Sequence, residues 1–191
     1  MKICLYGASS NQIDERYIAQ TEEFGRLLAQ RGHSLVYGGG AQGLMGAAAR
    51  GVYEKGGEML GIAPSFFQVD GILFEDCSEF IYTETMRERK QLMEENADAF
   101  VVTPGGIGTF EEFFEILTLK QLGRHEKPIV IYNMLRYYDT MKAMMEEAIE
   151  KQFMKPTCRE LYAFLDTAEA VLDYFEGYTP NKAGAKYFKN I

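Results

Sequence analysis

The stretch ADAFVVTPGGIGTFEEFFEILTLKQL, residues 97–122, decides the fold class of this chain. Its first part is a short apolar run rich in β-formers, which predicts a strand over residues 99–103. Pro104 and the glycines that follow predict a tight turn, and apolar residues then recur at helical spacing over residues 110–122. A strand that passes through a glycine turn into an amphipathic helix is the building unit of a parallel α/β sheet.

The same unit recurs along the whole chain. Further strands are predicted at residues 3–6, 34–37, 59–63, 79–82, 129–132 and 162–165, and further helices at residues 14–31, 43–55, 86–96, 138–152 and 168–175. We therefore expect an α/β fold, a parallel sheet covered by helices, in one domain over residues 1–178. Residues 179–191 are expected to form a loose C-terminal tail.

Composition restricts the possible functions. A length of 191 residues fits one domain at roughly 150 residues each. The net charge of −8 disfavours binding to nucleic-acid backbones and anionic membranes. The three cysteines form no C-x-x-C pair, and neither a secretory h-region nor an apolar run near 18 residues is present. We expect a cytoplasmic protein with no nucleic-acid or membrane partner and, with only two histidines, no metal site.

The first of two glycine-rich turns follows the strand at residues 34–37. Gly38, Gly40 and Gly43 satisfy the pattern G-x-G-x-x-G between a strand and a helix. The rest of a dinucleotide-binding fingerprint is missing, because the next strand ends in Pro64 and Ser65 with no acidic residue for a ribose. The turn is therefore interpreted as a contributor to a phosphate site, through Gly39, Gly40 and Gly43.

The second glycine turn is the one in the opening stretch. The amides of Gly105, Gly106, Gly108 and Thr109, together with a helix N-terminus, are expected to form a cradle for an anion. No lysine follows, as it does in a nucleoside-triphosphate P-loop, so that class is excluded. The alternative is a tight strand-to-helix turn with no ligand.

An arginine is expected to face inward from the helix at residues 86–96. At about 100° per residue, Arg89 shares a helical stripe with Met86 and Met93, whereas Arg87 and Lys90 lie on another. A charge on a core-facing stripe requires an anionic partner, because an unpaired buried ion is costly. Arg89 is therefore a candidate functional residue.

Glu112 is the matching candidate on the following helix. Ile116 and Leu119 continue its stripe, and the polar stripe belongs to its neighbour Glu111. The alternative is a capping box, in which Glu112 bonds back to the amide of Thr109 as the helix cap. At a helix N-terminus the carboxylate is expected to stay ionised.

Two of these segments resemble the signatures of a known family. PGGIGTFEE at residues 104–112 is similar to P-G-G-x-G-T-x-x-E, and MRERK at residues 86–90 is similar to M-x-x-R-K. Both are signatures of the Lonely Guy (LOG) family, cytokinin riboside 5′-monophosphate phosphoribohydrolases that are often mislabelled lysine decarboxylases. The resemblance implies a Rossmann-like fold, a homodimer, and hydrolysis of the N-glycosidic bond of a nucleoside 5′-monophosphate without a cofactor. It also implies that Arg89 and Glu112 are the catalytic pair, with Met86 and Lys90 beside the substrate.

The chain departs from the family pattern at Arg87, Leu135, Arg136 and Thr140, near the end expected to bind the base, so the preferred base stays open. Two other functions also stay open. One is a non-catalytic carrier of a phosphorylated pterin-type cofactor. The other is lysine decarboxylation, which requires a Schiff-base lysine, and Lys90 has no evident partner for the cofactor ring.

Overall fold

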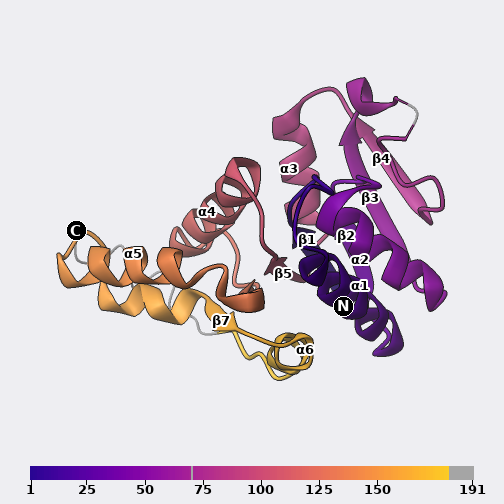
Figure 1. Ribbon diagram of the computed structural model, residues 1–191. Helices are drawn as coiled ribbons and strands as arrows, with labels where there is room; N and C mark the ends of the chain where they lie inside the picture. Colours follow the sequence, from indigo (N-terminus) through magenta and orange to yellow (C-terminus); the bar gives the residue numbers. More distant parts are fainter. Residues whose placement is uncertain (70, 181–191) are drawn as a thin grey trace.

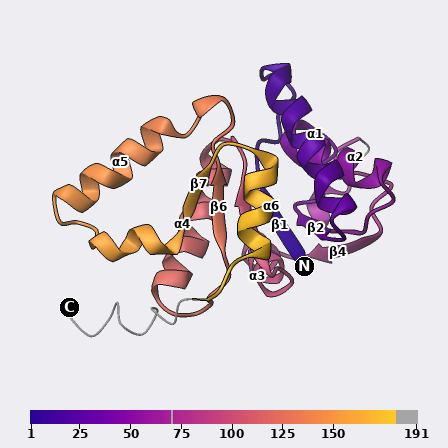
Figure 2. The same ribbon diagram turned by 90° about the horizontal axis from the view of Figure 1, so that it is seen from below.

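A computed structural model describes residues 1–69 and 71–180 of the chain, and these residues form one seven-stranded sheet with helices on both faces (Figures 1 and 2). Every strand pair in it is parallel. The strands are β1 (Lys2–Tyr6), β2 (Ser34–Tyr37), β3 (Met59–Pro64), β4 (Glu79–Thr83), β5 (Ala99–Val102), β6 (Ile129–Tyr132) and β7 (Ala163–Leu165), in the spatial order β4-β3-β2-β1-β5-β6-β7. The predicted α/β class and its seven strands are confirmed.

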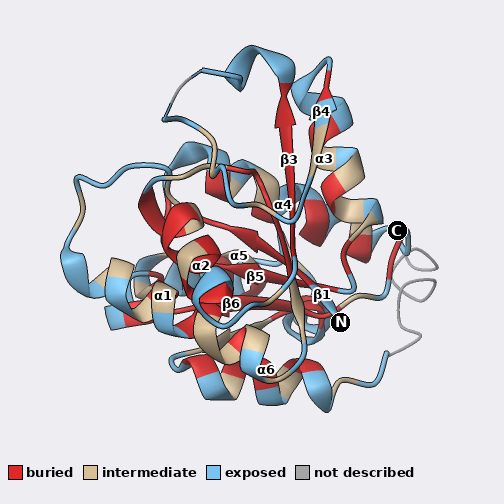
Figure 3. Ribbon diagram, turned by 90° about the vertical axis from the view of Figure 1, so that its right-hand side faces the viewer, coloured by how far each residue is buried: buried red, intermediate tan, exposed pale blue. Residues whose placement is uncertain are grey.

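The helices divide between the two faces because side chains alternate along each strand. In β1, Ile3 and Leu5 join one core cluster, whereas Cys4 and Tyr6 join the other. The first face carries α1 (Glu15–Gln30), α2 (Gly43–Glu54) and α6 (Ala168–Glu176); the second carries α3 (Met86–Glu95), α4 (Ile107–Gln121) and α5 (Asp139–Glu150). Figure 3 shows the inner strands β1, β3, β5 and β6 as the buried layer and the outer helix faces as exposed. The inner strands are buried on both faces, which explains their continuous apolar runs in the sequence.

The order of the strands reverses next to β1. From β1 the chain proceeds through β2 and β3 to β4 at one edge, and then returns to β5 on the other side of β1. The helices that follow β1 and β5 therefore leave toward opposite faces of the sheet, and their loops separate. Open α/β sheets bind ligands at such a switch point, outside the carboxyl ends of the strands.

Helix α4 begins at Ile107, three residues before the predicted start, because the chain adopts helical geometry within the glycine turn itself. Most of the expected tail, residues 181–191, lies outside the described residues. Among the helices that are described, none is both long and apolar enough to span a bilayer.

Candidate active site

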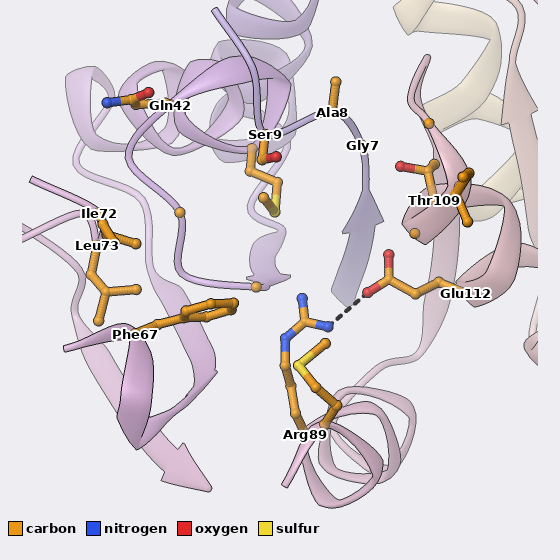
Figure 4. A pocket seen from close by; sticks show the side chains of 17 residues that line it. Gly7, Ala8, Ser9, Gln42, Phe67, Ile72, Leu73, Arg89, Thr109 and Glu112 are labelled. Carbon is orange, nitrogen blue, oxygen red and sulfur yellow. Dashed lines mark hydrogen bonds and ion pairs between the residues drawn. The ribbon is translucent and has the colours of Figure 1, made fainter. Parts of the chain in front are cut away.

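A cavity of about 550 Å³ opens at the switch point, within the size range of small-molecule sites (Figure 4). It lies between the loop after β1, the glycine turn after β2, the loop after β3, and the N-terminal ends of α3 and α4. The lining residues are Gly7, Ala8, Ser9, Gly38, Gly40, Gln42, Met45, Phe67, Ile72, Leu73, Met86, Arg89, Gly106, Ile107, Gly108, Thr109 and Glu112.

Arg89 enters this cavity from α3, which begins at Met86 with Thr85 as its cap. The arginine is only 6 % exposed, and Met93 on the same stripe is fully buried. Its Nε donates to the carbonyl of Ile62 at 3.2 Å, and its Nη1 donates to Glu112 Oε1 at 2.8 Å. These two bonds hold the guanidinium at the cavity wall, and Figure 4 shows the one to Glu112.

The remaining nitrogen of Arg89 lies against the backbone of the first glycine turn. A Cβ placed on Gly38 lies 2.2 Å from Arg89 Nη2, far inside van der Waals contact. Any residue other than glycine at position 38 would therefore clash with the guanidinium where it lies. Among the described residues Nη2 has no hydrogen-bond partner, and it remains available to a ligand.

Glu112 pairs with Arg89 and does not cap its own helix, so the capping-box alternative is wrong. The cap of α4 is Gly106, which places Glu112 in the second turn, beyond reach of the cap amide. Burial raises the pKa of Glu112 above its usual value, and the nearby Arg89 charge opposes that rise. We expected the helix N-terminus to keep this carboxylate ionised. The structure instead places the carboxylate in a desolvated position, paired with Arg89.

The N-terminus of α4 forms the wall of the cavity that lies across from Phe67 and Leu73 (Figure 4). The first three amides of the helix, on Ile107, Gly108 and Thr109, have no carbonyl one turn earlier within the helix. The described residues supply no other hydrogen-bond partner for them. These amides and the positive end of the helix dipole make this wall suitable for an anion.

Four residues predicted for the site lie outside the cavity lining. Gly43 donates its amide to Asn11 Oδ1 at 2.7 Å, and the carbonyl of Gly39 accepts from Phe74. Gly105 is buried beneath the Thr109 side chain, where a Cβ would clash with Thr109 Oγ1 at 2.1 Å. Lys90 pairs with Glu111 and, at 2.9 Å, with Glu115 in a separate cleft between α3 and α4.

Other lining residues were missed by the sequence analysis. The loop Gly7 to Ser9 follows the central strand, and its position at a strand's carboxyl end was the signal that could have identified it. Phe67, Ile72 and Leu73 carry no such signal, because loop residues between β3 and β4 face the cavity only through the path of the folded chain.

The departures from the family pattern lie elsewhere. The side chains of Arg87, Leu135, Arg136 and Thr140 are absent from the lining of this cavity. Arg87 lines the separate cleft between α3 and α4. Within this chain, the candidate wall for a base is the apolar group on the loop after β3.

Fold and cavity together define a Rossmann-like α/β protein in which the open N-terminus of a helix lies beside a largely buried arginine–glutamate pair. A family described as "possible lysine decarboxylase" matches residues 45–175. A cytokinin riboside 5′-monophosphate phosphoribohydrolase of Arabidopsis thaliana is 36 % identical over 179 residues, 94 % of this chain and 84 % of the relative. A probable enzyme of the same name from Oryza sativa subsp. japonica is 34 % identical over 94 % of this chain and 85 % of its own. The chain belongs to this LOG family of phosphoribohydrolases.

Solved structures support the fold. The molybdenum cofactor (Moco) carrier protein from Chlamydomonas reinhardtii aligns with a TM-score of 0.69 and 20 % identity, over 92 % of this chain and 94 % of its own. The molybdenum cofactor binding protein from Rippkaea orientalis aligns with a TM-score of 0.66 and 16 % identity, over 92 % and 93 % of the two chains. At these identities the likeness concerns the fold alone.

The decarboxylase description does not fit the cavity. Pyridoxal phosphate chemistry requires a lysine that forms a Schiff base with the cofactor. No lysine is among the described residues that line the cavity, and Lys90 is held by Glu111 and Glu115 outside it. The described residues also contain no group of three or more His, Cys, Asp or Glu side chains able to hold a metal ion.

Proposed function

We propose that this protein hydrolyses the N-glycosidic bond of a nucleoside 5′-monophosphate, AMP or N6-prenylated AMP, to the free base and ribose 5-phosphate. The observation that carries the proposal is the pair of Arg89 and Glu112, joined at 2.8 Å in a cavity that the N-terminus of α4 also lines. The names of the relatives, phosphoribohydrolases of cytokinin riboside 5′-monophosphates, support the same reaction.

The two ends of the cavity suit the two ends of such a substrate. The 5′-phosphate binds the amides of Ile107, Gly108 and Thr109, where negative charge is stabilised. The base faces Phe67 and Leu73, which lie across the cavity from Thr109 in Figure 4. The ribose then spans the centre of the cavity, beside Glu112.

Cleavage of the glycosidic bond develops positive charge on the ribose, as it does in sugar hydrolysis. The carboxylate of Glu112 stabilises that charge or orients the water whose oxygen adds to the anomeric carbon, and the proton that this water loses goes to the departing base. Arg89 holds the carboxylate in place through Nη1 and offers Nη2 to the anionic part of the ligand.

A homodimer and a cytoplasmic location complete the proposal. Large apolar side chains are exposed on α4 and α5, notably Phe114 at 37 % and Met144 at 52 %. Such side chains suit an interface with a second copy of the chain. A reducing compartment such as the cytoplasm suits three cysteines that are all free thiols.

The test compares Glu112→Gln with Glu111→Gln on AMP and N6-isopentenyladenosine monophosphate, with products separated by liquid chromatography. Glu111 is the matched control, because it neighbours Glu112 in the chain but pairs with Lys90 outside the cavity. We expect Glu112→Gln to abolish turnover and Glu111→Gln to retain it. Intact nucleotide at high concentrations of the unmodified enzyme would refute the reaction.

The same experiment addresses a carrier function. A protein that only carries a phosphorylated cofactor would retain a bound fluorescent ligand through purification and hydrolyse neither nucleotide. Catalytic turnover that depends on Glu112 excludes a purely binding role for this cavity.

A further inference from the structure

The loop between β6 and α5 lies behind the anion-binding wall and contributes two tyrosines to its support. Tyr137 Oη donates to the carbonyl of Gly105 at 2.6 Å, and Tyr138 Oη donates to the carbonyl of Thr103 at 2.8 Å. Neither tyrosine lines the cavity. Both hydroxyls therefore contact the backbone of the turn without entering the cavity.

The loop holds this conformation at a cost. Leu135 and Arg136 have φ angles of 50° and 65°, in the left-handed region that non-glycine residues rarely adopt. Asn133 offsets that cost, because its side chain accepts from the amide of Tyr138 at 2.7 Å and donates to Asp139 at 2.9 Å. The side-chain bonds of Asn133 thus set where the two tyrosines point.

Tyr137 has a specific consequence for the cradle. The Gly105 carbonyl is four residues before the Thr109 amide, so the two groups would bond if the helix extended backward by one residue. That bond would remove the Thr109 amide from the anion-binding wall. The Tyr137 hydroxyl instead takes the Gly105 carbonyl as its acceptor, and α4 begins after Gly106.

We propose that Tyr137 is a positioning residue for phosphate binding: its hydroxyl holds the Gly105 carbonyl away from Thr109, so that the amides at the start of α4 stay open to the 5′-phosphate. This inference rests on the proposed function, in which the cradle binds the phosphate of the nucleotide and of the product ribose 5-phosphate.

The experiment compares Tyr137→Phe with Tyr162→Phe. Tyr162 is the matched control, because its buried hydroxyl has no hydrogen-bond partner among the described residues. Tyr137 is 41 % exposed, and its ring keeps its edge contacts with Tyr17 and Tyr138 in the variant, so we expect Tyr137→Phe to fold. Calorimetry measures the Kd of ribose 5-phosphate and of adenine, and steady-state kinetics measures KM and kcat.

We expect Tyr137→Phe to weaken ribose 5-phosphate binding and to raise the nucleotide KM, each about 10-fold, the effect of one well-made hydrogen bond. Adenine binding and kcat should change less than threefold, and Tyr162→Phe should match the unmodified enzyme throughout. Unchanged ribose 5-phosphate binding, or an equal loss for adenine, overturns the inference. If the unmodified enzyme binds ribose 5-phosphate but leaves nucleotides intact, the proposed function fails instead.

Discussion

Replacing Gly38 with alanine should reduce activity by displacing Arg89, while the side chains of Arg89 and Glu112 themselves stay unchanged. Gly38 lies in the turn after β2, and a Cβ there lies 2.2 Å from Arg89 Nη2. Ordinary contact begins near 3.4 Å, so the guanidinium must move by about 1.2 Å, the difference between these two distances. Because Arg89 is anchored to Ile62 and Glu112, this movement must weaken at least one of those bonds.

The expected loss follows from that displacement. A misplacement of about 1 Å in a catalytic arrangement costs on the order of 100-fold in rate, so we expect kcat/KM to fall by that factor. The free energy of unfolding should fall by about 1–3 kcal/mol, the usual effect of overpacking a buried position. The loss of activity should therefore appear in a protein that is still folded.

The assay is nucleotide hydrolysis followed by liquid chromatography, with thermal unfolding measured on the same samples. Gly177→Ala is the control, because Gly177 has a negative φ of −88° at the end of α6 and lies away from the cavity. Activity of Gly38→Ala within threefold of the unmodified enzyme would refute the view that the position of Arg89 matters for the reaction.

Three further predictions concern other parts of the molecule. Burial raises the pKa of Glu112, and the reaction uses the ionised carboxylate. We therefore expect kcat/KM to fall as the pH decreases, with a midpoint above the usual glutamate pKa of about 4.3. A pH–rate profile without this fall contradicts the prediction. Phe67→Ala should raise the KM of a nucleotide with an apolar N6 group up to about 10-fold and leave ribose 5-phosphate affinity unchanged in calorimetry. Burial lowers the pKa of Lys120 to about 8, and its ammonium has no hydrogen-bond partner among the described residues. We therefore expect Lys120→Met to raise the free energy of unfolding at pH 7 by roughly 2–3 kcal/mol, measured by urea unfolding. That gain should shrink as the pH rises from about 8 toward 10.5, because the buried amine of the original protein becomes neutral while the unfolded chain is still protonated; a gain independent of pH would contradict the cause given.

Helical periodicity was sufficient to select the two central residues. Arg89 lies on an apolar stripe with Met93, and Glu112 lies on one with Ile116, so their inward orientation followed from 100° per residue. Periodicity does not show which residue begins a helix when glycines precede it. The capping-box alternative placed the helix start at Thr109 for that reason. The start of α4 at Ile107 resolves it.

The glycine patterns predicted which residues line the cavity less well than the apolar stripes of the helices did. Gly39 and Gly43 carry positive φ angles of 75° and 61°, and they shape the first turn without lining the cavity. A glycine that a turn needs for its backbone and a glycine that a ligand needs for access are identical in sequence. In sequence, Lys90 is likewise identical to a ligand-binding lysine, and only the fold places Glu111 and Glu115 beside it.

The sequence by itself determined the parallel α/β architecture, the two strand-to-helix turns and the inward direction of Arg89 and Glu112, because these depend on neighbours within about one turn of chain. Only the tertiary structure decided that the two side chains meet. Residues 89 and 112 follow different strands, β4 at the sheet edge and β5 beside β1, and the return of the chain across the sheet places α3 and α4 on one face. That placement is decided by which strands pair and how both cores fill, which are long-range interactions that no local pattern encodes.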